Sequence, residues 1–378
     1  MLNDASMPAP ALASAIAADL RLTVDTAEHD PAWDAFVAAT PGGHHAQTSL
    51  WARVKAVLGW EATRLVVRQG EEIAGGVQLL TRAVGRAGRV GFAPRGPLLA
   101  NDDPRLLDEV QRAMMDFGRE RRVRYLKVQP PTDRHDLVDA LRARGWTPSA
   151  MEAAPTADVR VDLEPTEEEM FGRLRGSTRN YVRQAPKRGL EIRSGGEQDL
   201  AAYYSMIEAT SRRQDFVPYP SRYYETMWRA FAEGEGGRAQ LLLAELDGKL
   251  LSSTLIIGYG DSATYKMGGW VGEKTRVRPS EAIQWAGIEW AKRAGYRYYD
   301  FDGINKTAAV ALLRGGEEAE NARKGVAAFK LQFGGEIVLH PGALDSTPSP
   351  LLRPAVRIAA PRIDRLQRVA HRALGRGA

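Results

Sequence analysis

The chain of 378 residues contains no cysteine. This absence excludes disulfides, thiolate metal ligands and a cysteine nucleophile. No apolar run approaches the ~18 residues that a membrane-spanning helix needs. Residues 1–19 lack a basic start followed by an apolar stretch, so we expect a flexible arm there rather than a signal peptide. Together these absences favour a cytoplasmic protein.

Histidine is scarce, and charge of one sign is only slightly in excess. The six histidines, among them His44, His45, His135, His340 and His371, show no triad or metal spacing, so we assign them no role and expect no metal. The net charge is +5 and the pI is about 9.3. This balance suits a polyanionic partner such as tRNA, a nucleotide diphosphate or anionic lipid. It also suits a surface on which arginine simply replaces lysine.

The hydrophobic pattern predicts an α/β (α+β) chain with an internal duplication. One order of elements (strand, two helices, three hairpin-connected strands, helix, strand, helix, strand) occurs twice, from residue 20 to 163 and from 190 to 339. The segment 121–128 takes the same place in the first series as 293–300 in the second. This order resembles the acyl-CoA N-acetyltransferase (GNAT) fold, and we therefore expect two such domains in tandem.

The expected boundaries follow from this repeat. Residues 20–163 would form the first GNAT-like domain, completed by 324–342, and 164–323 would form the second. The tail over 343–378 contains arginines every three or four residues beside an apolar stripe, which predicts a basic amphipathic helix. Two readings stay open for 353–376: peripheral contact with the anionic inner membrane, or packing on the first domain.

The loops that would bind coenzyme A lack the sequence pattern that acyl-CoA transferases of this fold have there. An acyl-CoA transferase needs a short Gly-rich turn whose backbone N–H groups bind the pyrophosphate. The corresponding segments, 93–98 and 269–279, lack that pattern, and Pro97 removes a backbone donor. The mismatch favours a relative that takes its acyl group from something other than coenzyme A, and we expect no cofactor.

Seven short segments, in one order along the chain, resemble the Fem family of non-ribosomal peptidyl transferases. They cover about residues 47–342 and read SLWARVK (49–55), PRGP (94–97), RNYVRQAPKRGL (179–190), Thr210 with Arg213 and Tyr223-Tyr224, YKMGG (265–269), YDFDGI (299–304) and Phe329-Lys330. The resemblance implies transfer of an amino acid from aminoacyl-tRNA to the stem-peptide amine of a peptidoglycan precursor, either lipid II or UDP-MurNAc-pentapeptide. It implies a cytoplasmic transferase, peripheral on the inner face of the membrane if the tail binds there.

The resemblance also implies roles for individual residues. Lys55, on one helix face with Trp51, and Arg213 would bind the diphosphate of the precursor, for which a planar guanidinium is suited. Tyr223 and Tyr265 would line the precursor site. Lys330 would stabilise the tetrahedral transition state or the tRNA acceptor end, with Phe329 packed beside it.

Asp300 lies at the end of a predicted strand, where active-site residues often collect, and alternation places Asp302 on the same face. We count Asp300 among the substrate-binding candidates, while pairing with Arg297 or a lysine, a metal and a general base stay open. Arg175, Arg179, Arg183 and Lys187 recur every four residues as one basic stripe. The stripe would contact tRNA phosphates or pair with 167–169.

Two other function classes remain open at this point. One is a related tandem transferase that acts on a lipid or protein, or uses an acyl group derived from coenzyme A. The other is a non-catalytic RNA- or membrane-binding protein. The sequence identifies neither the amino acid transferred nor a general base.

Overall fold

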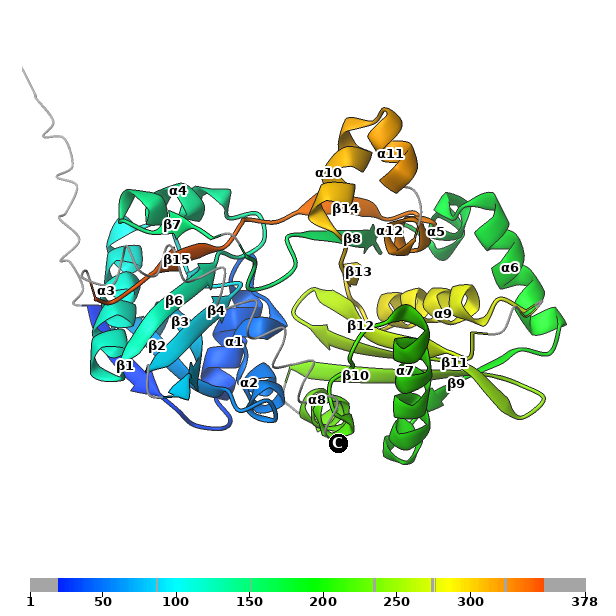
Figure 1. Ribbon diagram of the computed structural model, residues 1–378, viewed down its shortest axis with the longest axis horizontal. Helices are drawn as coiled ribbons and strands as arrows, with labels where there is room; N and C mark the ends of the chain where they lie inside the picture. Colours follow the sequence, from blue (N-terminus) through cyan, green and yellow to red (C-terminus); the bar gives the residue numbers. More distant parts are fainter. Residues whose placement is uncertain are drawn as a thin grey trace, which may run out of the picture.

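The computed structural model describes residues 20–349 except 86–87, 150, 234–235, 273–274, 276 and 323–324. Two mixed sheets lie side by side (Figure 1). The first half of the chain contains β1 (Leu20–Asp25), α1 (Pro31–Ala39), η1 (His45–Gln47), α2 (Ser49–Ala56), β2 (Glu61–Gln69), β3 (Glu72–Ala83), β4 (Arg89–Pro94), β5 (Leu98–Leu99), α3 (Pro104–Glu120), β6 (Val123–Gln129), α4 (His135–Ala143) and β7 (Thr147–Pro148).

The second half begins with β8, the strand that follows β7 in the chain. It contains β8 (Ala157–Asp162), α5 (Glu167–Arg173), α6 (Gly176–Lys187), β9 (Glu191–Gly195), η3 (Glu197–Asp199), α7 (Leu200–Gln214), α8 (Ser221–Glu233), β10 (Gly237–Leu246), β11 (Lys249–Tyr259), β12 (Ser262–Trp270), α9 (Pro279–Arg293), β13 (Tyr298–Gly303), α10 (Lys306–Arg314), α11 (Glu317–Ala322), α12 (Val326–Leu331), β14 (Glu336–Leu339) and β15 (Leu344–Ser346).

The repeated order predicted from the sequence is present in both sheets. The first sheet contains β1-β2-β3-β4-β6 as neighbours in this order. The second sheet, followed from its β9 edge, contains β9-β10-β11-β12-β13 in the same arrangement. In each, the first four strands are antiparallel neighbours and the last pair is parallel. The α/β fold with two GNAT-like domains is therefore confirmed.

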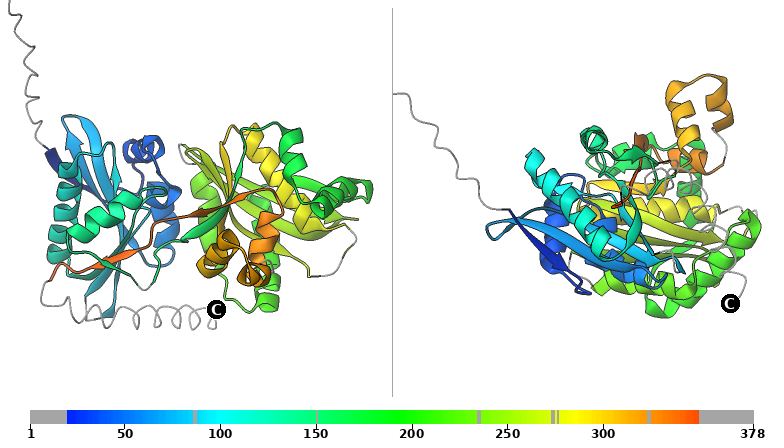
Figure 2. Two further views of the ribbon diagram at one scale, coloured as in Figure 1. Left: turned by 90° about the horizontal axis from the view of Figure 1, so that it is seen from above. Right: turned by 60° about the vertical axis from the view of Figure 1, so that its left-hand side comes forward.

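The domain boundaries differ from the expected ones, because the two sheets exchange a strand. β8, which we assigned to the first domain, lies in the second sheet between β13 and β14. β15, which we assigned to the tail, lies in the first sheet between β6 and β7. The segment 324–342 supplies β14 to the second sheet and does not complete the first. The left view in Figure 2 shows the chain crossing between the halves along these segments.

The two halves share one apolar core. Helices α1 and α2 contribute Trp33, Leu50 and Trp51, and helices α7 and α8 contribute Tyr203 and Phe231, among others, to a single buried cluster. A second cluster lies between α3 and the other face of the first sheet, and a third between α9 and the other face of the second. Both sheets are thus covered on both faces, which explains the continuous burial of β3 and β11.

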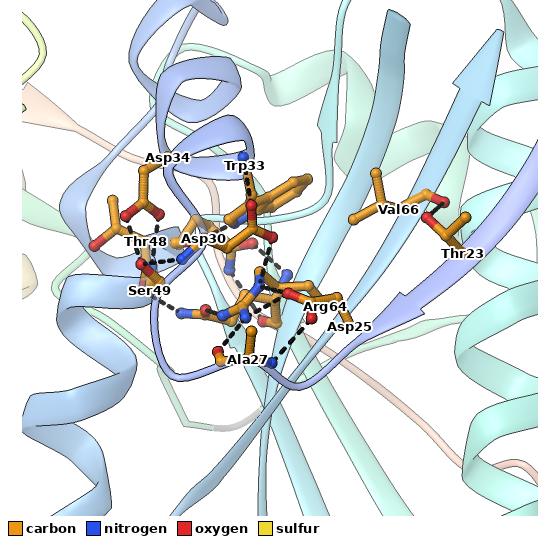
Figure 3. A network of polar contacts seen from close by, with 12 residues as sticks. Thr23, Asp25, Ala27, Asp30, Trp33, Asp34, Thr48, Ser49, Arg64 and Val66 are labelled. Carbon is orange, nitrogen blue, oxygen red and sulfur yellow. Dashed lines mark hydrogen bonds and ion pairs between the residues drawn. The ribbon is translucent and has the colours of Figure 1, made fainter. Parts of the chain in front are cut away.

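A buried arginine holds the start of the chain against the first sheet (Figure 3). The guanidinium of Arg64 on β2 lies 2.6 Å from Asp25 Oδ2 and 3.1 Å from Asp30 Oδ2, and it donates to Gln78 Oε1 at 3.2 Å. Asp30 in turn caps α1 by accepting from the backbone N–H of Trp33. The network fixes α1, and through it the loop that leads to α2.

The segment that connects β8 to β9 forms two helices, α5 and α6, although its charged sequence over 166–188 predicts one. Thr166 and Glu169 form a reciprocal capping box at the start of α5. The buried Leu174 then takes an extended conformation that ends α5, and Arg175 becomes the N-cap of α6. None of the described helices has the length and apolar character to cross a membrane. The predicted tail helix over 353–376 lies outside the described residues.

Candidate active site

The candidate site lies where strands β12 and β13 separate. Their parallel pairing ends at Thr264 and Asp300. Two residues further along each strand, the Nζ of Lys266 lies 2.7 Å from Oδ2 of Asp302, so an ion pair takes the place of the backbone pairing. Asp302 has a φ of 59°, in the left-handed region that aspartate tolerates better than most residues. The turned backbone directs the carbonyl groups of the strand end toward α12.

Lys330 on α12 fills the space beside that strand end. Its buried Nζ donates to the carbonyl oxygens of Asp302 at 3.2 Å and Gly303 at 2.7 Å. Burial lowers the pKa of Lys330, while Asp302 and other nearby carboxylates oppose the shift. An ammonium has three donors, and these contacts use two. Phe329 packs by its edge on Phe333, with 5.5 Å between the ring centroids.

Lys55 approaches the same region from α2, inside an aromatic enclosure. Its Nζ lies 5.3 Å from the ring centroid of Trp51, 5.8 Å from that of Tyr219 and 5.7 Å from that of Tyr223. Burial, followed by the charge of Lys266, lowers the pKa of Lys55 to about 8. The half-buried ammonium therefore faces a poorly hydrated space instead of open solvent.

Lys266 connects the Lys55 enclosure to Asp302. Its Nζ lies 5.1 Å from the centroid of the same Trp51 ring and 3.5 Å from Nε2 of His45. Burial alone would raise the pKa of Asp302, but the ammonium groups of Lys266 and Lys330 hold it well below its usual range. Burial also keeps the pKa of His45 well below its ordinary value. The group is thus three cations around one carboxylate, with a neutral imidazole alongside.

Asp300 belongs to a separate buried cluster. Its Oδ2 lies 3.6 Å from Arg160, whereas Arg297 pairs with Glu164. Of the alternatives for Asp300, the arginine partner is therefore on β8 and not at 297. Burial, together with the nearby Asp158, raises the pKa of Asp300 to about 7. Both Asp300 and Arg160 line a cavity of about 320 Å³ between the two halves.

The crossing segments meet beside this cluster. Asp158 at the start of β8 lies 3.5 Å from Arg95 and forms a short hydrogen bond with His340, the residue that follows β14. Burial raises the pKa of Asp158 to about 6 and lowers that of His340 to about 3. Among the described residues, no group of three metal-ligating side chains has a geometry that could hold an ion.

The other predicted substrate residues lie on α7, α8 and β12 of the second half. Tyr223 is buried on α8, 6.4 Å from Trp51 between ring centroids, so it lies at the Lys55 enclosure. Tyr265 packs against Phe301, and burial raises its pKa to about 12. Arg213 donates to the carbonyl of Val271 at 3.2 Å and stacks on Trp270.

The basic stripe begins next to α12. The hydroxyl of Thr178 on α6 donates to Gln332 Oε1 at 2.9 Å, two residues after Lys330. Arg179 donates to the Leu174 carbonyl at 2.8 Å, and Arg183 stacks on Phe171. Arg175, as the N-cap, and Lys187 are exposed. The Glu169 carboxylate accepts from the backbone N–H of Thr166 in its capping box. It therefore does not pair with the basic stripe.

Sequence reasoning missed several residues of this site. Lys266 was read only as part of a motif, and His44 and His45 were given no role because their spacing matched no triad. The Lys266–His45 contact joins residues 221 positions apart. Tyr219, which stacks on Tyr223 at 4.3 Å, was also missed. The available signal was the aromatic run Tyr219, Tyr223 and Tyr224 at the start of α8, the helix that packs on α2.

Comparison with known proteins agrees with this architecture. The chain is 26% identical over 231 residues to a lipid II:glycine glycyltransferase of Staphylococcus saprophyticus, which covers 58% of this chain and 55% of that protein. It is 24% identical over 240 residues to the protein of the same name in Staphylococcus aureus, covering 61% and 56%. The chain thus spans about half the length of the curated relatives that it matches.

Solved structures agree in fold. The crystal structure of FemX superposes with a TM-score of 0.76 at 19% identity, over 88% of this chain and 99% of that one. A tandem GNAT protein from the clavulanic acid pathway gives a TM-score of 0.53 at 15% identity, over 88% and 99%. The FemAB family model matches residues 28–255 and 247–360, which together make up most of the sequence. The chain belongs to the FemAB family.

Proposed function

We propose that this protein transfers an amino acid from aminoacyl-tRNA to the stem-peptide amine of a peptidoglycan precursor, in the form of lipid II or UDP-MurNAc-pentapeptide. The observation that carries the proposal is the cluster of three ammonium groups, on Lys55, Lys266 and Lys330, at the open end of β12 and β13. Membership of the FemAB family and the names of the curated relatives supply the reaction class.

The proposed acceptor carries a diphosphate, and Lys55 is suited to bind it. A cation in a partly dehydrated aromatic enclosure attracts an anion more strongly than one in water does. Tyr219 and Tyr223 would provide the walls of the binding site for the adjoining sugar or nucleotide. Arg213 would have to leave its present carbonyl partners to reach the same phosphates.

The proposed chemistry is attack of a neutral amine on the ester carbonyl of the donor. The carbonyl oxygen becomes an oxyanion in the tetrahedral intermediate, which collapses to the amide as the tRNA 3′-oxygen leaves as a hydroxyl, with the proton that the amine nitrogen releases. Lys330 has one donor remaining for that oxyanion and is held in place by two carbonyl groups. A pre-positioned cation stabilises the charge without reorganising at the moment of reaction.

The donor tRNA would lie across α6. Arg175, Arg183 and Lys187 are exposed there, and α6 begins beside α12, so phosphates on this surface would direct an acceptor end toward Lys330. The proposed location is the cytoplasmic face of the membrane, where tRNA and precursor meet.

The direct test is incubation with a panel of charged tRNAs and either precursor, read by mass spectrometry. A mass increase of one amino-acid residue on the stem peptide is the expected result. The control is the same mixture with deacylated tRNA. A product formed from acyl-CoA instead, or no product from any charged tRNA, would contradict the proposal.

A further inference from the structure

The carboxylate of Asp302 is fixed more firmly than its partner Lys266. The Oδ1 of Asp302 accepts from the backbone N–H of Gly303 at 2.9 Å, and its own N–H donates to Asp300 at 2.7 Å. Its carbonyl is held by Lys330. Lys266, in contrast, reaches the carboxylate through a flexible four-carbon chain. When a carboxylate is fixed and its ammonium partner can move away, the carboxylate can bind the ammonium group of a ligand in its place.

From this geometry we propose that Asp302 binds the ammonium group of the acceptor amine, and that Lys266 occupies this subsite in the free protein. The inference rests on the proposed function for the identity of the acceptor. It adds to that function the group that recognises the amine. A diamino acid in a stem peptide ends in a primary ammonium on an alkyl chain, which is the chemical group that Lys266 now places on Asp302.

An anionic ligand would give the ammonium of Lys266 a second binding partner. Its Nζ and that of Lys55 both lie close to the Trp51 ring, at 5.1 and 5.3 Å from the centroid. Two ammonium groups around one ring repel each other, and a diphosphate between them would remove that repulsion. Binding of the phosphates would therefore draw Lys266 away from Asp302 and open the amine subsite in the same step.

The subsite lies next to the group that would stabilise the transition state. One residue, Asp302, contacts Lys266 through its side chain and Lys330 through its carbonyl. An ammonium that replaces Lys266 would thus lie beside the oxyanion lysine, and after losing one proton to solvent it would be the neutral amine that attacks the ester carbonyl. Because the amine would already be positioned beside the ester, the translational and rotational entropy of bringing the two together would be lost on binding and not in the chemical step.

The test compares two forms of UDP-MurNAc-pentapeptide with lysine in the stem, one with a free side-chain amine and one with that amine acetylated. Calorimetry should show that the wild-type protein binds the free-amine form about 10- to 100-fold more tightly, as for a hydrogen-bonded charge pair. Asp302→Asn should bind both forms alike, because the discriminating carboxylate is gone. Retained binding of the acetylated form reports that the variant is folded.

Two further variants separate this role from a structural one. Lys266→Met should increase the preference for the free amine, because it removes the competing ammonium. Asp247→Asn changes another aspartate with positive φ, in the exposed turn between β10 and β11, and should keep the wild-type preference. A wild-type protein that binds neither form or both equally, or an Asp302→Asn variant that still discriminates, would overturn the inference. Discrimination without any aminoacyl transfer would instead leave the inference standing and refute the proposed function.

Discussion

Precursor binding should weaken over a pH range in which ordinary lysines remain charged. Burial and the neighbouring Lys266 place the pKa of Lys55 at about 8, below its usual value. The shift is downward, so the charge is present at pH 7 and is lost as the pH rises through 8. For a single group of this pKa, the protonated fraction falls from about 0.9 at pH 7 to about 0.1 at pH 9. If only the charged form holds the diphosphate, the affinity falls about tenfold.

Titration calorimetry at pH 7, 8 and 9 measures this effect. The ligand is UDP-MurNAc-pentapeptide with an acetylated side-chain amine, so that the ligand's own amine does not titrate in the same range. The matched variant is Lys55→Arg, whose guanidinium stays protonated throughout and should give a flat profile. Constant wild-type affinity between pH 7 and 9, or an equal loss in the arginine variant, would refute the reasoning.

The remaining predictions concern turnover, the second phosphate ligand, stability and the tail. Lys330→Ala should lower turnover about 100- to 1,000-fold with little change in precursor affinity; rates within a few fold of wild type would exclude the oxyanion role. Arg213→Ala and Lys55→Ala should weaken precursor binding non-additively in calorimetry, because both would hold one diphosphate; strict additivity would separate them. Arg64→Met should destabilise the protein by about 1–3 kcal/mol in denaturant unfolding, because it removes charged hydrogen bonds to the half-buried Asp25 and Asp30; an unchanged stability would contradict that role. Removal of the predicted tail helix, 353–376, should abolish salt-sensitive co-sedimentation with anionic vesicles; equal sedimentation of both forms would favour the packed helix.

The parts of the fold with strong local patterns could be predicted from the sequence. The apolar pattern predicts strands over 62–68 and 73–81, and β2 and β3 lie at Glu61–Gln69 and Glu72–Ala83. It predicts a helix over 104–121, and α3 lies at Pro104–Glu120, where Asp103 and Pro104 give a clear N-terminal signal. In each case the signal comes from neighbours in the sequence.

The strand exchange and the core of the site could not be predicted in this way. β15 has three residues, and it is a strand only because β6 and β7 pair with it. Likewise, the Lys266–Asp302 contact depends on where two parallel strands separate, and the sequence does not record that point. Lys55 and Lys330 were found through the family resemblance, while their shared surroundings came from tertiary packing.

The exchanged strands impose an order on how the protein is made. During synthesis the amino-terminal half emerges first, yet the strand that lies between β6 and β7 is not translated until Leu344–Ser346. The early half must wait with an open gap in its sheet, exposing unpaired backbone groups, while some two hundred further residues are added. The second half, by contrast, receives β8 before any of its other strands exists (Figure 1). Cutting the gene after β7 would therefore leave the amino-terminal fragment without its inner strand β15, whereas the carboxy-terminal fragment would keep every strand of its own sheet and carry β15 without β6 and β7; the amino-terminal half is not a separable module.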